Sequence, residues 1–279
     1  MSAMFSRVLT TVVTLPVMFF IIVFLPHFSY AALSVLAVAT AIYATKEMKG
    51  LYKKAEGIDM HFPSFVVGIL PVAQWLEIGY WPNLPLVDLA VVCMALAFFS
   101  TELFYGVQDD FKKTFSRIGG ESLILLYPGL LITFIQRLTA LNHPTQSLLL
   151  FFLLVFGNDV FAFLFGMSLG RSNKGLVKVS PNKSIAGFVG GTLSTVLLAV
   201  LFCIFVPGIK DDVSILQAIV LGLLTSIAAN IGDLIESAFK RSANVKDSGH
   251  LIPGRGGLLD SIDSMLAAAP IFWVVLSIF

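Results

Sequence analysis

Residues 186–207 read AGFVGGTLSTVLLAVLFCIFVP, a run of 22 residues without a charged side chain. A hydrocarbon core about 30 Å thick requires roughly 20 apolar residues in a helix, so this run predicts a membrane-spanning helix. Similar runs lie on both sides of it, and none has the period-2 alternation of a membrane barrel. We expect spans near residues 8–26, 30–45, 62–81, 84–101, 122–138, 147–170, 186–207, 213–236 and 262–279.

The composition predicts the same class of protein. Of 279 residues, 57% are hydrophobic and 13% are charged, 25 are Phe, and the mean hydropathy is +0.90. Soluble domains average roughly 45–50% apolar and about 25% charged residues, so this chain has too little polar surface for a water-soluble globule. We expect an all-α, polytopic integral membrane protein of about nine transmembrane helices, forming a single membrane domain over residues 1–279. Cys93 and Cys203 lie in apolar runs and are expected to be buried thiols.

The basic residues predict the orientation of the spans. Lys and Arg accumulate on the cytoplasmic side of membrane proteins. With nine spans and a cytoplasmic N-terminus, all of the 18 Lys and Arg except Arg137 and Lys210 fall on the cytoplasmic face. The first run is preceded by Arg7, but its apolar stretch is longer than that of a signal peptide, so we expect an uncleaved span.

Charged residues return in the C-terminal part of the chain. Residues 233–263 hold Asp233, Glu236, Lys240, Arg241, Lys246, Asp247, Arg255, Asp260 and Asp263. Ionisable groups at membrane depth are expensive and are functional candidates by default. From Asp233 to Arg241 the polar residues are spaced by three and four, which places them on one helical face. A Glu236–Lys240 pair that closes the end of a helix is a simpler explanation for part of this pattern.

A loop and two further acids complete this region. Residues 246–257, KDSGHLIPGRGG, cannot continue a helix. Asp260 and Asp263 follow one turn apart at the start of the last span, where acids also serve as caps. Separated carboxylates, several cations and a glycine-bearing loop together suit Mg²⁺ and a polyphosphate. These residues alone predict a membrane enzyme that handles phosphates.

The run over residues 237–263, SAFKRSANVKDSGHLIPGRGGLLDSID, resembles the signature of the phosphatidate cytidylyltransferases, also called CDP-diacylglycerol synthases. Upstream, Asp159 in GNDVFAFLFG and Lys183 in KVSPNKSIAGFVGG resemble two further patterns of that family. Two positions depart from the signature: Arg255 replaces a His and Ser261 replaces an Arg. A paralogue with an altered acceptor is therefore the alternative to the conventional activity.

The resemblance implies transfer of the cytidylyl group of CTP to phosphatidate, giving CDP-diacylglycerol and pyrophosphate for phospholipid biosynthesis. It implies catalytic roles for Asp233, Lys240, Asp260 and Asp263. Substrate binding would fall to Asp159, Lys183, Ser184, Ser237, Arg241, Lys246 and Arg255. Mg²⁺ would be held by Asp233, Asp260 and Asp263, with Asp247 in support. Whether a monovalent cation joins the Mg²⁺ is left open.

The resemblance also implies where the enzyme works and with what. Residues 147–279 would form the catalytic part and residues 1–146 the N-terminal helices. The protein would be a multi-pass protein of the bacterial cytoplasmic (inner) membrane, with its active site facing the cytoplasm. Its partners would be CTP, phosphatidate and membrane lipid, with a homodimer as an option and no nucleic acid.

Two other functions remain open at this point. A related CTP-dependent kinase of a polyprenol or another lipid alcohol would need a base to deprotonate its acceptor. A transporter could use the acids Glu77, Asp88, Glu102 and Asp159 along a path. Glu77 and Asp88, however, flank a predicted extracytoplasmic loop, which favours a solvated helix end for both.

Overall fold

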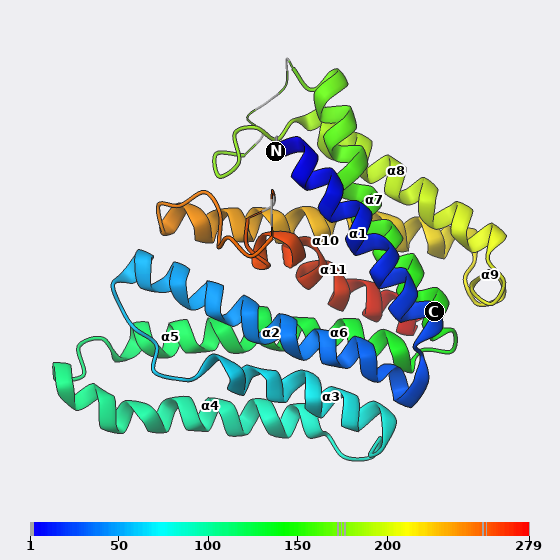
Figure 1. Cartoon of the computed structure of the whole chain (residues 1–279). Helices are drawn as coiled ribbons and strands as arrows, with labels where there is room; N and C mark the ends of the chain where they lie inside the picture. Colours follow the sequence, from blue (N-terminus) through cyan, green and yellow to red (C-terminus); the bar gives the residue numbers. More distant parts are fainter. Residues whose placement is uncertain are drawn as a thin grey trace. The chain divides into compact units, whose positions relative to one another are not determined.

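The computed structural model describes residues 3–171, 173, 175, 177–252, 254 and 256–278, with side chains described from residue 13 onward. Over these residues the regular structure is helical and contains no strand (Figure 1). Two isolated β-bridges, Val177 with Ser180 and Ile252 with Gly256, tighten loops. The predicted all-α class is thereby confirmed.

The longer helices are α1 (Ala3–Phe24), α2 (His27–Glu56), α3 (Ile69–Gly79), α4 (Leu86–Tyr105), α5 (Thr114–Ile124), α7 (Pro144–Leu169), α8 (Ile185–Phe205), α10 (Ile215–Ser242) and α11 (Leu259–Ile278). Shorter elements join them: η1 (Ser64–Gly68), η2 (Gly106–Asp109), η3 (Leu125–Leu130), α6 (Leu131–Arg137), η4 (Leu138–Ala140) and α9 (Ile209–Asp212).

Seven helical segments among the described residues are long and apolar enough to cross a membrane. They are His27–Glu56, Leu86–Asp109, Thr114–Ala140, Pro144–Leu169, Ile185–Phe205, Ile215–Ser242 and Leu259–Ile278. Two shorter apolar helices, Val13–Phe24 and Ser64–Gly79, fall where the first and third predicted spans were expected. A multi-pass membrane protein is confirmed. The count of nine and the cytoplasmic N-terminus stay predictions.

The chain divides into two compact units. The first combines Met1–Arg137 with Phe239–Ser261, and the second combines Leu138–Ala238 with Ile262–Phe279. Helices α10 and α11 each contribute residues to both units. The predicted division into residues 1–146 and 147–279 concerns catalytic roles, so it stays a prediction.

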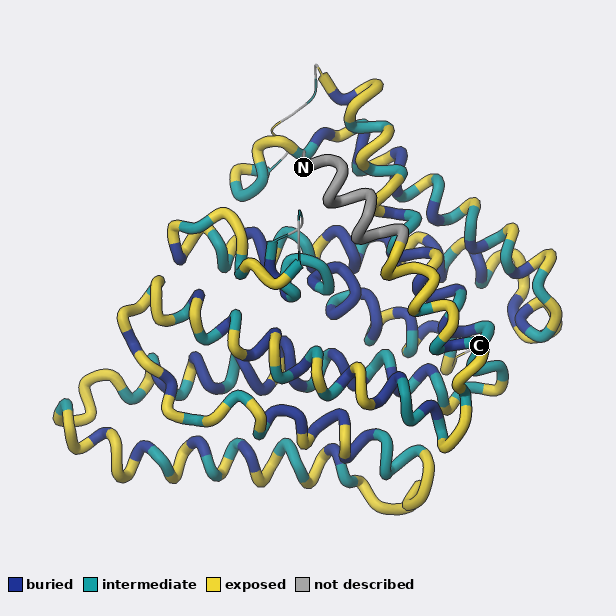
Figure 2. Tube along the Cα trace, in the orientation of Figure 1, coloured by how far each residue is buried: buried dark blue, intermediate teal, exposed yellow. Residues whose placement is uncertain are grey.

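In the first unit, α2 buries one face against its neighbours. Leu33, Ala37, Ala41, Ala44 and Met48 are buried, and their spacing of three and four residues places them on one side of the helix. Figure 2 shows the resulting alternation of buried and exposed residues along α2. The other side of the helix is therefore left to membrane lipid or to solvent.

The first unit also contains a buried ion cluster. Arg117 of α5 donates to Glu102 Oε1 at 2.7 Å and to both carboxylate oxygens of Asp109, at 2.8 and 3.2 Å. Arg117 and Glu102 are both buried. Glu77 Oε2 accepts the backbone N–H of Val87 at the start of α4, which fits the predicted role at a helix end. Glu102 and Glu77 therefore have structural partners.

In the second unit, α7 and α8 pack closely through small residues. A Cβ on Gly187 would lie 2.7 Å from the carbonyl oxygen of Ala162, a backbone atom that cannot move aside. Phe151 of α7 and Phe272 of α11, both fully buried, meet edge to face at 5.3 Å. Cys203 of α8 is buried as predicted, whereas Cys93 of α4 is exposed, which corrects the expectation for that thiol.

Substituting Gly187→Val tests the contact between α7 and α8. The added side chain forces the two helices apart, so we expect a loss of about 1–3 kcal/mol in stability. The control is Gly119→Ala in α5, where nothing lies within 4 Å of the new methyl group. Thermal unfolding in detergent should show a lower Tm for Gly187→Val only. Equal Tm values would contradict the close packing.

Candidate active site

Helix α10 carries a stripe of polar residues. Ser226, Asn230, Asp233 and Ser237 are spaced by four, three and four residues, so they share one face of the helix. Ser226, Asn230 and Ser237 are buried. The sequence predicted this stripe from Asp233 onward, and the structure extends it two turns deeper into the second unit.

A cavity of about 720 Å³ opens in the second unit beside this stripe. Helices α7, α8 and α10 and the loop between α7 and α8 form its walls. Its polar lining residues are Asp159, Arg171, Asn182, Lys183, Ser184, Asn230 and Asp233. Phe163, Met167, Phe188 and Leu234 add apolar wall. The cavity thus offers charge and apolar surface to the same ligand.

An ion pair lies at the wall of this cavity. Lys183 Nζ is 2.7 Å from Asp233 Oδ2, and Ser237 donates to Asp233 Oδ1 at 3.4 Å. The two charged side chains remain 27% and 37% exposed, so a ligand can reach both. Lys183 follows α7 by more than a dozen residues and Asp233 lies in α10, so only the fold brings them together.

Ser184 has a structural partner in the same wall. Its backbone is extended, and its Oγ accepts the N–H of Gly187 at 3.0 Å, which caps the N-terminus of α8. The cap fixes the start of α8 and, with it, the position of the preceding Lys183. The predicted role of Ser184 in binding substrate stays a prediction.

A buried polar network joins α7, α8 and α10 next to the cavity, which it reaches through Asn230. Asn158 Oδ1 accepts from Ser226 at 2.7 Å, from Asn230 at 3.4 Å and from Thr195 at 3.5 Å. Buried polar groups are costly unless hydrogen-bonded, so these partners hold α7, α8 and α10 in register. Asn158 was not among the predicted site residues, although its place beside Asp159 and the Ser226–Asn230 spacing were available signals.

The first unit contains a second polar centre at Asp260, near the start of α11. Asp260 Oδ1 lies 2.6 Å from Lys240 Nζ. Asp260 Oδ2 accepts the N–H groups of Ser248 at 2.8 Å and Gly257 at 2.7 Å, and the Ser248 hydroxyl at 2.9 Å. The side chain is only 6% exposed. One buried carboxylate thus fastens both ends of the loop between α10 and α11.

Glu47 of α2 holds the same loop from the N-terminal half of the chain. Its two carboxylate oxygens accept the N–H groups of Leu258 at 2.9 Å and Leu259 at 2.7 Å, and the Ser248 hydroxyl at 3.2 Å. These N–H groups belong to the start of α11, which has no helical partner for them. Glu47 was not among the predicted site residues, because its partners lie more than 200 residues away in the sequence.

Gly257 is required by this arrangement. A Cβ on Gly257 would collide with Ser248 Oγ and would lie 2.6 Å from Glu47 Oε2. Its N–H is used by Asp260, and that of Gly256 is used by the carbonyl of Ile252. Gly256 and Gly257 therefore form a tight turn in this loop.

The sequence of the chain matches a known family. Residues 5–279 match the model described as the cytidylyltransferase family.

The chain belongs to the cytidylyltransferase family. It is 34% identical over 222 residues, 77% of this chain and 71% of the relative, to the "Uncharacterized protein YnbB" of Escherichia coli strain K12. It is 30% identical over 211 residues, 75% of this chain and 76% of the relative, to the phosphatidate cytidylyltransferase of Staphylococcus saprophyticus. Identity to the phosphatidate cytidylyltransferase of Bacillus subtilis is 31% over 189 residues, covering 67% and 69% of the two chains.

For this cytidylyltransferase family member, the structure gathers four of the predicted site residues in one cavity: Asp159, Lys183, Ser184 and Asp233. Asp260 and Lys240 pair in the other unit. Arg241, Lys246 and Asp247 are exposed at the end of α10 and in the following loop. Asp263 is buried in the second unit, where its carbonyl packs against Gly232. Arg255 lies outside the described residues.

The predicted metal site can be tested against these contacts. No three His, Cys, Asp or Glu residues gather among the described residues in a way that would enclose a cation. Mg²⁺, however, is usually held by one or two carboxylates together with substrate phosphates, so a full protein cage is not required. The half-exposed Asp233 has the donor chemistry for such a site, and the metal stays a prediction.

Substituting Glu47→Gln tests the anchoring of the loop. An amide can accept on one oxygen only, and its NH₂ group would face a backbone donor, which costs about 1–3 kcal/mol. We expect hydrogen exchange at the N–H groups of Leu258 and Leu259 to accelerate by about fivefold or more, which corresponds to the lower end of that cost. The matched control is Glu56→Gln, an exposed acid of the same helix. Equal protection in Glu47→Gln and the parent chain would remove Glu47 from this role.

Proposed function

We propose that the chain is a phosphatidate cytidylyltransferase, which makes CDP-diacylglycerol and pyrophosphate from CTP and phosphatidate. The observation that carries the proposal is the cavity in which Asp159, Lys183 and Asp233 meet, in a chain of the cytidylyltransferase family. The identity of the acceptor, phosphatidate, is inferred from relatives named phosphatidate cytidylyltransferase.

The chemistry of the acceptor fits the side chains that are present. A phosphate oxygen of phosphatidate attacks the α-phosphorus of CTP, a new P–O bond forms, and the bond to the β-phosphate breaks as pyrophosphate leaves. The attacking group is already an anion at neutral pH, so no general base is required. The site has to bring two anions together and stabilise the departing charge. Lys183 and Arg171 supply positive charge at the cavity for that purpose.

Within the proposal, Asp233 would hold Mg²⁺ in the second unit with Asp263 in support, and the ion would neutralise polyphosphate charge when bound. The metal-binding roles of Asp260 and Asp247 stay predictions. Lys240, Arg241, Lys246 and Arg255 would bind phosphates, and Ser184 and Ser237 would complete the pocket. Lys183 has a second role without the metal, because its ion pair with Asp233 at 2.7 Å orients that carboxylate. A homodimer stays a prediction.

We also propose that the cavity faces the cytoplasm from the inner membrane. With nine spans and a cytoplasmic N-terminus, the loop that carries Lys183 and the end of α10 both lie on the cytoplasmic side, where CTP is found. The transporter alternative loses support because Glu102 is tied to Arg117 and Glu77 to a backbone N–H.

The activity itself is the first test. Purified protein with Mg²⁺, phosphatidate and cytosine-labelled CTP should produce labelled CDP-diacylglycerol, and a chelator should stop it. Transfer of γ-labelled phosphate to a lipid alcohol would instead identify a kinase. Absence of the cytosine label from lipid, in protein that remains folded, would refute the proposal.

Substituting Lys183→Met tests the cavity. Removal of a preorganised charge from such a site costs about 10²- to 10³-fold in kcat. We expect a loss in that range for Lys183→Met and for Asp233→Asn. The fold loss of kcat in the double variant should be smaller than the product of the two single fold losses, because the residues form one pair. The control is Lys178→Met, an exposed residue of the same loop. Multiplicative losses would indicate that the two residues act separately.

A further inference from the structure

An apolar groove lies on the first unit between α2 and α3. Its volume is about 530 Å³. Ala31, Val35, Val38, Ala39 and Ile42 form its floor, and Val72 and Trp75 form its α3 wall, joined by Ser34 and Tyr43. The Ser34 hydroxyl already accepts a hydrogen bond from Gln136, so the groove presents hydrocarbon alone.

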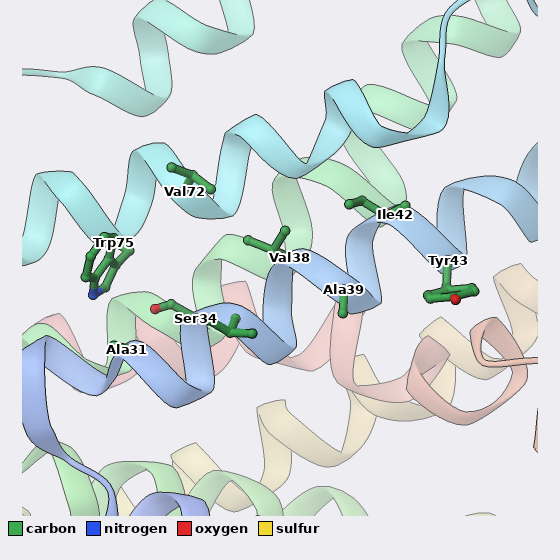
Figure 3. A pocket seen from close by; sticks show the side chains of 9 residues that line it. Ala31, Ser34, Val38, Ala39, Ile42, Tyr43, Val72 and Trp75 are labelled. Atoms are coloured by element: carbon green, nitrogen blue, oxygen red, sulfur yellow. The ribbon is translucent and has the colours of Figure 1, made fainter.

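The two ends of the groove are marked by aromatic residues. Figure 3 shows Trp75 at one end and Tyr43 at the other. The Trp75 indole N–H donates to the carbonyl of Phe28 at 2.9 Å, which fixes the ring at the groove. Tyr is enriched at the membrane–water interface, so we expect the Tyr43 end of the groove at the level of the lipid headgroups. At 1.5 Å per residue, α2 advances about 18 Å from Ala31 to Tyr43, slightly more than the roughly 15 Å of hydrocarbon in one leaflet.

A cation continues the line of the groove. Ala31, Val35, Ala39 and Ile42 are spaced by four, four and three residues, and Lys46 follows four residues later on the same face. The Lys46 ammonium group lies 4.8 Å from the centre of the Tyr43 ring and is exposed. An apolar channel therefore leads to an exposed positive charge at the level of the interface.

We propose that this groove binds one acyl chain of an anionic phospholipid, whose phosphate contacts Lys46. The groove matches the apolar part of such a lipid in length and chemistry, and Lys46 matches its charge. A juxtamembrane Lys attracts an anionic lipid by about fivefold in affinity. The proposal depends on the membrane location of α2 and α3 and not on the catalytic cavity, which belongs to the other unit.

Trp75 provides a direct reporter of groove occupancy. The chain has three Trp residues, so replacing Trp81 and Trp273 by Phe in the full-length protein leaves Trp75 alone. This protein is reconstituted in phosphatidylcholine vesicles for two titrations. One adds increasing fractions of brominated phosphatidylglycerol, and the other adds increasing fractions of brominated phosphatidylcholine, with the bromine on the acyl chains in both. Bromine quenches Trp fluorescence on contact. We expect half-maximal quenching at an about fivefold lower fraction of the anionic lipid.

Two variants assign the preference to the proposed contacts. Lys46→Gln should make the two brominated lipids equivalent, whereas Lys54→Gln, an exposed lysine of the same helix away from the groove, should keep the preference. Ala39→Phe fills the floor and should reduce quenching by both lipids. Equal quenching by both lipids in the parent protein would refute the proposal. An unchanged preference for the anionic lipid in Lys46→Gln would also refute it. A loss of quenching at high protein density would refute it too, because it would indicate that a second copy of the chain covers this face.

Discussion

Charge inside a membrane protein sets the main constraint on this fold. An unpaired ionisable side chain at membrane depth costs about 2.5–3.5 kcal/mol on insertion scales. Three pairs of described residues meet this cost, each inside one unit: Arg117 with Glu102, Lys183 with Asp233, and Lys240 with Asp260. These pairs differ in exposure. Arg117 and Glu102 are closed off, whereas Lys183 and Asp233 stay accessible from a cavity. This difference in access is the reason why we propose a functional role for the second pair only.

The loop before α11 depends on two carboxylates from distant parts of the chain. Asp260 and Glu47 together accept the N–H groups of Ser248, Gly257, Leu258 and Leu259. The acids thus replace the partners that the first turn of α11 lacks, and they place negative charge where the helix dipole favours it. The N-terminal half of the chain therefore does more than anchor the protein, because Glu47 shapes a loop of the family signature.

The sequence predicted those features that depend on local spacing or on composition. Apolar runs of about 20 residues located the seven helices that are long enough to span a membrane, and the spacing from Asp233 to Arg241 located the polar face of α10. Lys183 and Asp233 were assigned to one site through the family resemblance, and the structure pairs them at 2.7 Å. Glu47 and Arg171 were not found, because nothing local distinguishes an acid among lysines or one Arg in a basic loop. Asn158 was not found although it stands beside Asp159. Their roles arise from contacts between helices that no single stretch of sequence encodes.

The lining of the cavity also argues for the kind of acceptor. A water-soluble phosphate acceptor would need only polar walls, yet Phe163, Met167, Phe188 and Leu234 line the cavity together with Lys183, Asp233 and Arg171. An amphiphile with an anionic head and a hydrocarbon tail can satisfy both halves of that lining at once. Burial of its apolar part adds roughly 25 cal/mol per Å² to binding, while the cations hold its charged head. The same physical division, hydrocarbon beside a fixed charge, recurs in the groove between α2 and α3, where Lys46 takes the place of the ion pair.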